Sequence, residues 1–78
     1  MNAENLIKMA NDIGSFFEAM PNREQATRDV ATHIQKFWEP RMQKSLISYL
    51  GTHGDGNLKP IVRDALREIH PASFAARN

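Results

Sequence analysis

The sequence predicts an all-α protein, a small bundle of about four short amphipathic helices. Four prolines, Pro21, Pro40, Pro60 and Pro71, divide the 78-residue chain into segments of similar length. Apolar residues in each segment recur every three or four positions, and no segment alternates with period two. The length allows one domain, residues 1–78. We expect helices at roughly 3–20, 23–38, 40–50 and 59–69, followed by a flexible C-terminal tail at 71–78.

The first helix, at residues 3–20, has one apolar stripe. With successive residues placed 100° apart, four side chains fall within about 40° of Leu6, namely Ala10, Ile13, Phe17 and Met20. Pro21 ends the helix, because the residue before a proline is disfavoured in the α region. Gly14 lies near the edge of the stripe and costs roughly 1 kcal/mol relative to alanine. Close approach of another helix would explain this glycine.

The second helix, at residues 23–38, has a wide apolar face. Asn22 is a good N-cap, and Gln25 three residues later completes a capping-box pattern. Two lines run side by side along the helix, with Ala26, Val30, His33 and Phe37 in one and Thr27, Ala31, Ile34 and Trp38 in the other. A face this wide is broader than packing against one neighbouring helix requires. We therefore expect this helix to be central or to form half of an interface.

The third and fourth helices lie on either side of a glycine-rich loop at residues 51–57. Pro40 suits the first position of the third helix, and Gly51 is its predicted C-terminal stop. Pro60 suits the first turn of the fourth helix, and Pro71 prevents its continuation. The apolar faces consist of Met42, Leu46, Tyr49 and Leu50 in the third helix, with Ile47 pointing away, and of Leu58, Ile61, Val62, Ala65, Leu66 and Ile69 in the fourth.

The composition excludes several classes of protein. Without cysteine, the chain cannot form a thiolate zinc site, an iron–sulfur cluster or a redox dithiol. A net charge of +1 implies no strong electrostatic attraction to nucleic acid. No apolar run approaches the ~20 residues of a membrane span, and the first residues lack the basic start and apolar stretch of a signal peptide. We expect no membrane association and a cytoplasmic location.

The pattern groups no residues into a catalytic or metal site. His33, His53 and His70 lie in mid-helix, in a loop and at a helix end, and none has another ligand at metal-binding spacing. The loop at 51–57 lacks the Gly-Lys-Ser/Thr ending of a P-loop, and its single carboxylate, Asp55, is too few for an EF-hand. No carboxylate pair or nucleophile motif is evident. We expect no catalytic, cofactor-binding or metal-binding residue in this chain.

The most unusual segment is residues 33–42, with the sequence His-Ile-Gln-Lys-Phe-Trp-Glu-Pro-Arg-Met. It combines two aromatic residues, a proline turn and two cations, and Trp and Arg are enriched at binding hot spots. Trp38 either packs beneath the turn and closes the core or contacts a partner, and the two interpretations are compatible. An exposed Ile47 would enlarge such a patch. The hypothesised partner-binding residues are Phe37, Trp38, Pro40, Arg41, Met42 and Ile47.

Three stretches of the chain resemble a known family. They are residues 9–17 (Met-Ala-Asn-Asp-Ile-Gly-Ser-Phe-Phe), residues 33–42, and residues 58–63 (Leu-Lys-Pro-Ile-Val-Arg). With them, the chain resembles the delta subunits of NAD-dependent, molybdenum-containing formate dehydrogenases from about Leu6 to Leu66. The resemblance identifies five residues as signature positions only, Phe37, Trp38, Pro40, Arg41 and Met42. Their use as partner contacts is our hypothesis from the residue types.

The resemblance implies a non-catalytic accessory subunit, or an assembly or stability factor, of a cytoplasmic complex. The larger subunits of such a complex hold molybdopterin guanine dinucleotide, iron–sulfur clusters, FMN and NAD, and the resemblance implies that this chain binds none of them. Its expected partner is the catalytic subunit of formate dehydrogenase, bound by protein–protein contacts.

Two other functions are considered. Short helices with tight turns are the format of helix-turn-helix DNA-binding regulators, and Lys36, Arg41 and Lys44 lie near the second turn. A DNA-binding protein would normally have a stronger positive stripe, so we expect no nucleic acid partner. The wide faces of the second and fourth helices could also pair two copies into a homodimer when the chain is isolated, which would not contradict the accessory role.

Overall fold

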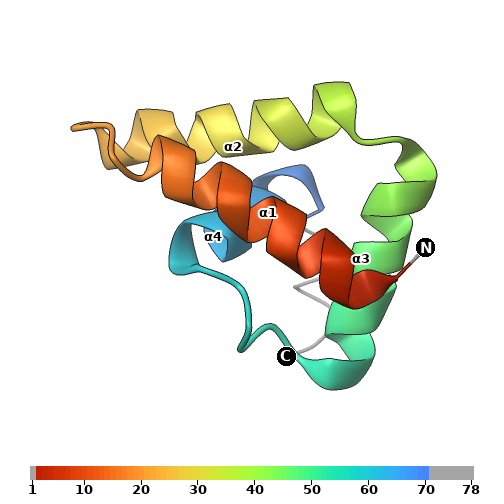
Figure 1. Ribbon diagram of the computed structural model, residues 1–78. Coiled ribbons are helices and arrows are strands. Elements are labelled where there is room, and N and C mark those ends of the chain that lie inside the picture. The colour runs from red at the N-terminus through yellow and green to blue at the C-terminus, as the bar shows by residue number, and fades with distance from the viewer. Residues whose placement is uncertain (1, 71–78) are drawn as a thin grey trace.

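The four proline-bounded segments are helices in the computed structural model, which describes residues 2–70 (Figure 1). They are α1 (Ala3–Phe17), α2 (Arg23–Phe37), α3 (Pro40–His53) and α4 (Pro60–Ile69). The predicted all-α class is confirmed, and residues 2–70 contain no strand. The predicted tail at 71–78 lies outside the described residues.

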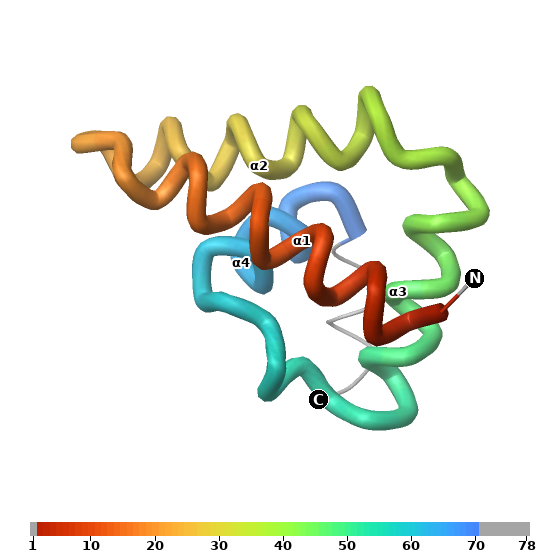
Figure 2. Tube along the Cα trace, in the orientation of Figure 1, coloured from red at the N-terminus to blue at the C-terminus, as the bar shows by residue number. Residues whose placement is uncertain are grey.

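α1 contacts each of the other three helices, and α4 packs most extensively against α2. Figure 1 shows α1 and α2 running in opposite directions, with α3 turning away from the end of α2. The tube in Figure 2 shows that the chain then returns from the end of α3 to α4, which lies behind α1. The described chain measures 33 × 27 × 22 Å along its principal axes. The core is therefore enclosed by helices that cross at several angles.

The first two helices begin at asparagine caps. The Asn2 side chain accepts a hydrogen bond of 2.8 Å from the Glu4 N–H, and Asn22 accepts one of 3.0 Å from the Gln25 N–H. The predicted capping box is half formed, because the Gln25 side chain donates to Asp29 instead of returning to Asn22. α1 ends at Phe17, earlier than predicted, since the residues before Pro21 form a turn.

α3 passes through Gly51, its predicted stop, and ends at His53. The stop lies at Gly54, whose φ of 83° falls in the left-handed region that favours glycine. Two contacts stabilise the extra turn: the His53 ring stacks on Tyr49 at 4.2 Å, and the Thr52 hydroxyl donates to the Ser48 carbonyl. A glycine stops a helix only where it adopts that backbone conformation, and Gly51 remains helical.

The start of α4 is held by α1, because its own residues provide no side-chain cap. The Asn11 side chain donates to the Asn57 carbonyl at 2.9 Å and accepts from the Lys59 N–H at 2.9 Å. The Lys59 ammonium also pairs with Glu18 at 3.1 Å. These three bonds fix the loop before α4 along one side of α1.

Gly14 allows α1 and α4 to approach closely. A Cβ at this position would lie 2.7 Å from Val62 Cγ2 and 3.1 Å from Ile61 Cγ2. Both neighbours are fully buried, so they have little room to move. They belong to a core that comprises Leu6, Ile7, Ala10, Ala26, Val30, Ala31, Ile34, Trp38, Leu46, Leu50, Leu58, Ile61, Val62, Ala65 and Leu66.

We predict that Gly14→Ala lowers the melting temperature, although alanine is the better helix former. The new methyl would overlap the stiff, β-branched Val62 and cost about 1–3 kcal/mol, more than the roughly 1 kcal/mol gained in helix propensity. Gly51→Ala is the matched control, since nothing lies within 4 Å of its Cβ position. Thermal unfolding followed by circular dichroism should show opposite shifts. Equal stabilisation by both substitutions would contradict the α1–α4 packing.

Candidate protein-interaction surface

Trp38 forms the turn between α2 and α3 and faces inward. Its N–H donates to the Ile34 carbonyl at 3.0 Å, the last bond of α2, and its own backbone is extended, with φ −89° and ψ 130°. The indole belongs to the core and is only 5% exposed. Of the two interpretations of Trp38, the structure favours the one in which the ring packs beneath the turn and closes the core.

Gln43 joins three helix ends, a role that the sequence pattern did not predict. Its Nε2 donates to the Trp38 carbonyl at 3.0 Å and more weakly to the Ile34 carbonyl at 3.4 Å. Its Oε1 lies 3.2 Å from His70 Nε2 at the end of α4. The bond to Trp38 satisfies a carbonyl at the end of α2, whereas the Ile34 carbonyl already accepts from the Trp38 N–H. The only sequence signal was an amide one turn after the helix-starting Pro40.

Phe37, next to Trp38, faces outward and is 71% exposed. Its ring lies 4.8 Å from that of His33, centroid to centroid, and His33 lies 6.3 Å from Phe17 on α1. Phe17 in turn meets Phe16 edge to face at 5.0 Å. Four rings from two helices thus form a continuous series, which we call the aromatic surface (Phe16, Phe17, His33 and Phe37).

Phe16, which was not among the hypothesised contact residues, lies on the surface. It is 75% exposed, more than any other large apolar residue among positions 2–70. Its place on the edge of the α1 stripe was visible from helical spacing, but spacing alone does not tell which edge a neighbouring helix covers. Met9, on the same edge, is 42% exposed. The aromatic surface therefore continues along α1 as an apolar margin.

The remaining residues of the hypothesised contact set lie in two environments. Pro40 and Arg41 are exposed at the start of α3, whereas Met42 and Ile47 are half-buried and pack against the core. The structure brings Phe37, Pro40 and Arg41 to the outside of the α2–α3 turn. Ile47 was expected to point away from the apolar face of α3. It packs against the core instead, so it does not extend an exposed patch.

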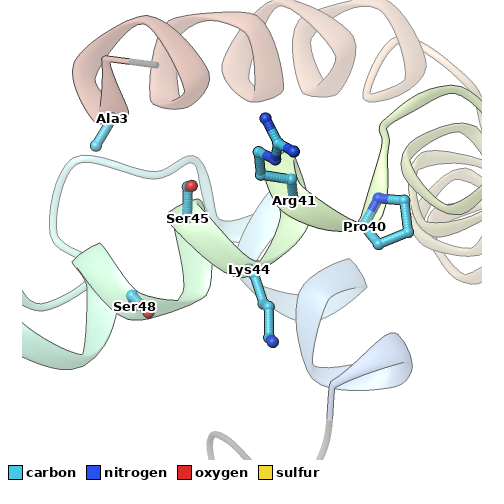
Figure 3. A pocket seen from close by; sticks show the side chains of 6 residues that line it. All are labelled: Ala3, Pro40, Arg41, Lys44, Ser45 and Ser48. Atoms are coloured by element: carbon cyan, nitrogen blue, oxygen red, sulfur yellow. The ribbon is translucent and has the colours of Figure 1, made fainter.

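A shallow cleft beside α1 is lined by the outer face of α3, with Ala3, Pro40, Arg41, Lys44, Ser45 and Ser48 on its walls (Figure 3). In Figure 3 the Arg41 guanidinium points toward α1, whereas the Lys44 side chain points away from it. The two cations do not converge on one point. The cleft therefore shows a basic, polar surface and no assembled binding site.

The three histidines have structural contacts and lie apart. His33 is part of the aromatic surface, His53 stacks on Tyr49, and His70 hydrogen-bonds Gln43. Within residues 2–70, no three His, Cys, Asp or Glu side chains are placed to hold a metal ion. None of the described helices is long and apolar enough to cross a membrane.

The basic residues of the described chain divide into those that form ion pairs and those that do not. Lys8, Arg23, Lys59, Arg63 and Arg67 each lie within 4 Å of a carboxylate. The other four in residues 2–70 have no such ion pair: Arg28 and Lys36 on α2, and Arg41 and Lys44 on α3. The cations without ion pairs therefore all lie on α2 and α3, the helices on either side of the turn at Trp38.

These features define an all-helical domain with an exposed aromatic surface and a basic turn beside it. Comparison with family models gives a match over residues 5–66 to the family described as the NADH-dependent formate dehydrogenase delta subunit, FdsD. The chain belongs to that family, as the resemblance implied. No curated protein and no solved structure matches the chain.

We predict that Trp38→Ala and Phe37→Ala have very different effects on stability. Removing the buried indole should cost about 3–5 kcal/mol, comparable with the whole stability of so small a domain. Removing the exposed Phe37 ring should change the free energy of unfolding by less than about 0.5 kcal/mol. Urea unfolding followed by circular dichroism compares them directly. A fully folded Trp38→Ala chain would contradict the inward placement of the indole.

Proposed function

We propose that this protein is a non-catalytic accessory subunit or assembly factor of a cytoplasmic, NAD-dependent formate dehydrogenase, and that it acts by binding the catalytic subunit. The observation that carries the proposal is the family match over residues 5–66. The exposed aromatic surface supports a binding role, because large exposed apolar groups commonly mark interaction sites.

The proposal assigns the redox chemistry to the larger subunits. They would hold molybdopterin guanine dinucleotide, iron–sulfur clusters, FMN and NAD. This chain has no cysteine thiolate to offer an iron–sulfur cluster. The side-chain contacts described above stabilise the fold or form the aromatic surface. We therefore assign it no catalytic residue.

Within the hypothesised contact set, we propose that exposed and buried members contribute differently. Phe37, Pro40 and Arg41 are exposed and available for direct contact. Trp38, Met42 and Ile47 pack against the core and would act by holding the turn in shape. Substitution of the second group would disturb binding through the fold, whereas substitution of the first would disturb the contact itself.

Co-expression tests the function. One expected outcome is that the tagged chain retains the formate dehydrogenase catalytic subunit at a fixed ratio. The other is that co-expression raises the specific activity of the enzyme, although the purified enzyme no longer contains this chain. The first outcome would identify a permanent subunit and the second an assembly factor. The control is the same enzyme expressed without this chain. The proposal is overturned if neither retention nor activity changes.

A further inference from the structure

The aromatic surface is a joined group of rings and not a set of scattered apolar residues. Phe16 and Phe37 are each more than 70% exposed, and Phe17 and His33 join them into one series. Ordinary surfaces carry single apolar residues, whereas a joined group of rings resembles the aromatic anchors at the centre of interfaces. The position of the rings therefore favours a partner that covers them.

The shape of the surface favours a helix as that partner. α1 and α2 lie side by side and run in opposite directions (Figure 1), and Phe17 on α1 meets His33 on α2. On α1, Met9, Ile13 and Phe16 recur at intervals of four and three residues, which places them on one line along the helix. Two neighbouring helices that present such a line can receive the apolar face of a third helix.

The charges beside the surface indicate the chemistry of the partner. Lys36 precedes Phe37 on α2, and Arg41 lies in the first turn of α3; both are exposed. Neither forms an ion pair with a carboxylate of residues 2–70. Asp12 pairs with Lys8 and Asp29 accepts from Gln25. Glu39, between Phe37 and Arg41, is exposed and forms no ion pair within residues 2–70, so two cations and one carboxylate without ion pairs lie at the turn. A partner with carboxylates at this end would complement the cations.

We propose that the aromatic surface, with Lys36 and Arg41 at its edge, is the docking site for an amphipathic helix of the formate dehydrogenase catalytic subunit, one that has acidic residues beside its apolar stripe. This inference rests on the proposed function and adds the surface and the chemistry of the partner. The rings provide the apolar contact, and the two cations orient the helix by pairing with its carboxylates.

The aromatic part is tested by the affinity of the full-length chain for purified catalytic subunit. Phe16→Gln combined with Phe37→Gln should raise Kd by about tenfold or more, as expected for aromatic anchors. Ser15→Gln is the matched control on an exposed position of α1 and should leave Kd within about twofold. Unchanged melting temperatures would show that the variants remain folded. Unchanged affinity of the double variant would overturn the proposal.

The charge part compares two cations on one helix. Lys36→Glu should weaken binding, and the loss should shrink as salt rises from about 50 to 500 mM, because screening reduces surface electrostatics. Arg28→Glu is the control, since Arg28 lies with Arg23, Glu24 and Asp64 in a depression on the α2–α4 side. Equal effects of both reversals would indicate net charge alone and would overturn the assignment of this edge.

A photo-crosslinking residue in place of Phe37 identifies the occupant. Capture of an acidic, amphipathic helical segment of the catalytic subunit is the expected result. Capture of a second copy of this chain, or of a segment without acidic residues, would overturn the inference. If wild-type chain binds the catalytic subunit but none of these variants matters, the proposed function stands and the docking site is wrong. If the wild-type chain does not bind at all, both are wrong.

Discussion

The close approach of α1 to α4 is the contact that fixes where the fourth helix begins. α4 has only ten residues and no side-chain cap, so its own sequence does little to fix its start. Gly14 leaves room for the Val62 methyl, and Asn11 binds the backbone of the preceding loop on both sides. α4 also makes the most extensive helix–helix contact, with α2. The position of α4 against α1 therefore bears on how α2 and α4 pack.

A second constraint acts at the α2–α3 turn, where two neighbouring aromatic residues have opposite environments. Phe37 ends α2, and Trp38 adopts an extended backbone that turns the indole into the core. Gln43 then donates to the Trp38 carbonyl at the end of α2 and reaches the end of α4 through His70. The turn is therefore fixed by Trp38 and Gln43, and the Phe37 ring is left on the outer side.

Local signals were sufficient to predict the helices but insufficient to predict which side of each helix is covered. Asn22 caps α2 as its side chain predicts, because capping needs only neighbouring residues. The prediction that Gly51 ends α3 was wrong, because helix termination depends on the backbone angle that a glycine adopts. Gly54, not Gly51, has the positive φ that ends the helix. Phe37 and Trp38 both lie on apolar lines of α2. Only the packing of other helices decides that the first stays outside, so the aromatic surface could not be found from periodicity.

The exposed rings connect the stability of this domain with its proposed binding role. Covering a phenylalanine contributes about 1.5–3 kcal/mol, and two such rings together match the stability expected of a core this small. A partner that covers Phe16 and Phe37 would therefore stabilise the fold as well as the complex, since a ligand that binds only the folded state shifts the folding equilibrium. The family to which the chain belongs is that of a subunit, and the proposed docking site would supply such a partner in its complex. On this basis, burial of the two rings against the catalytic subunit would favour assembly and would add stability that the small core does not provide.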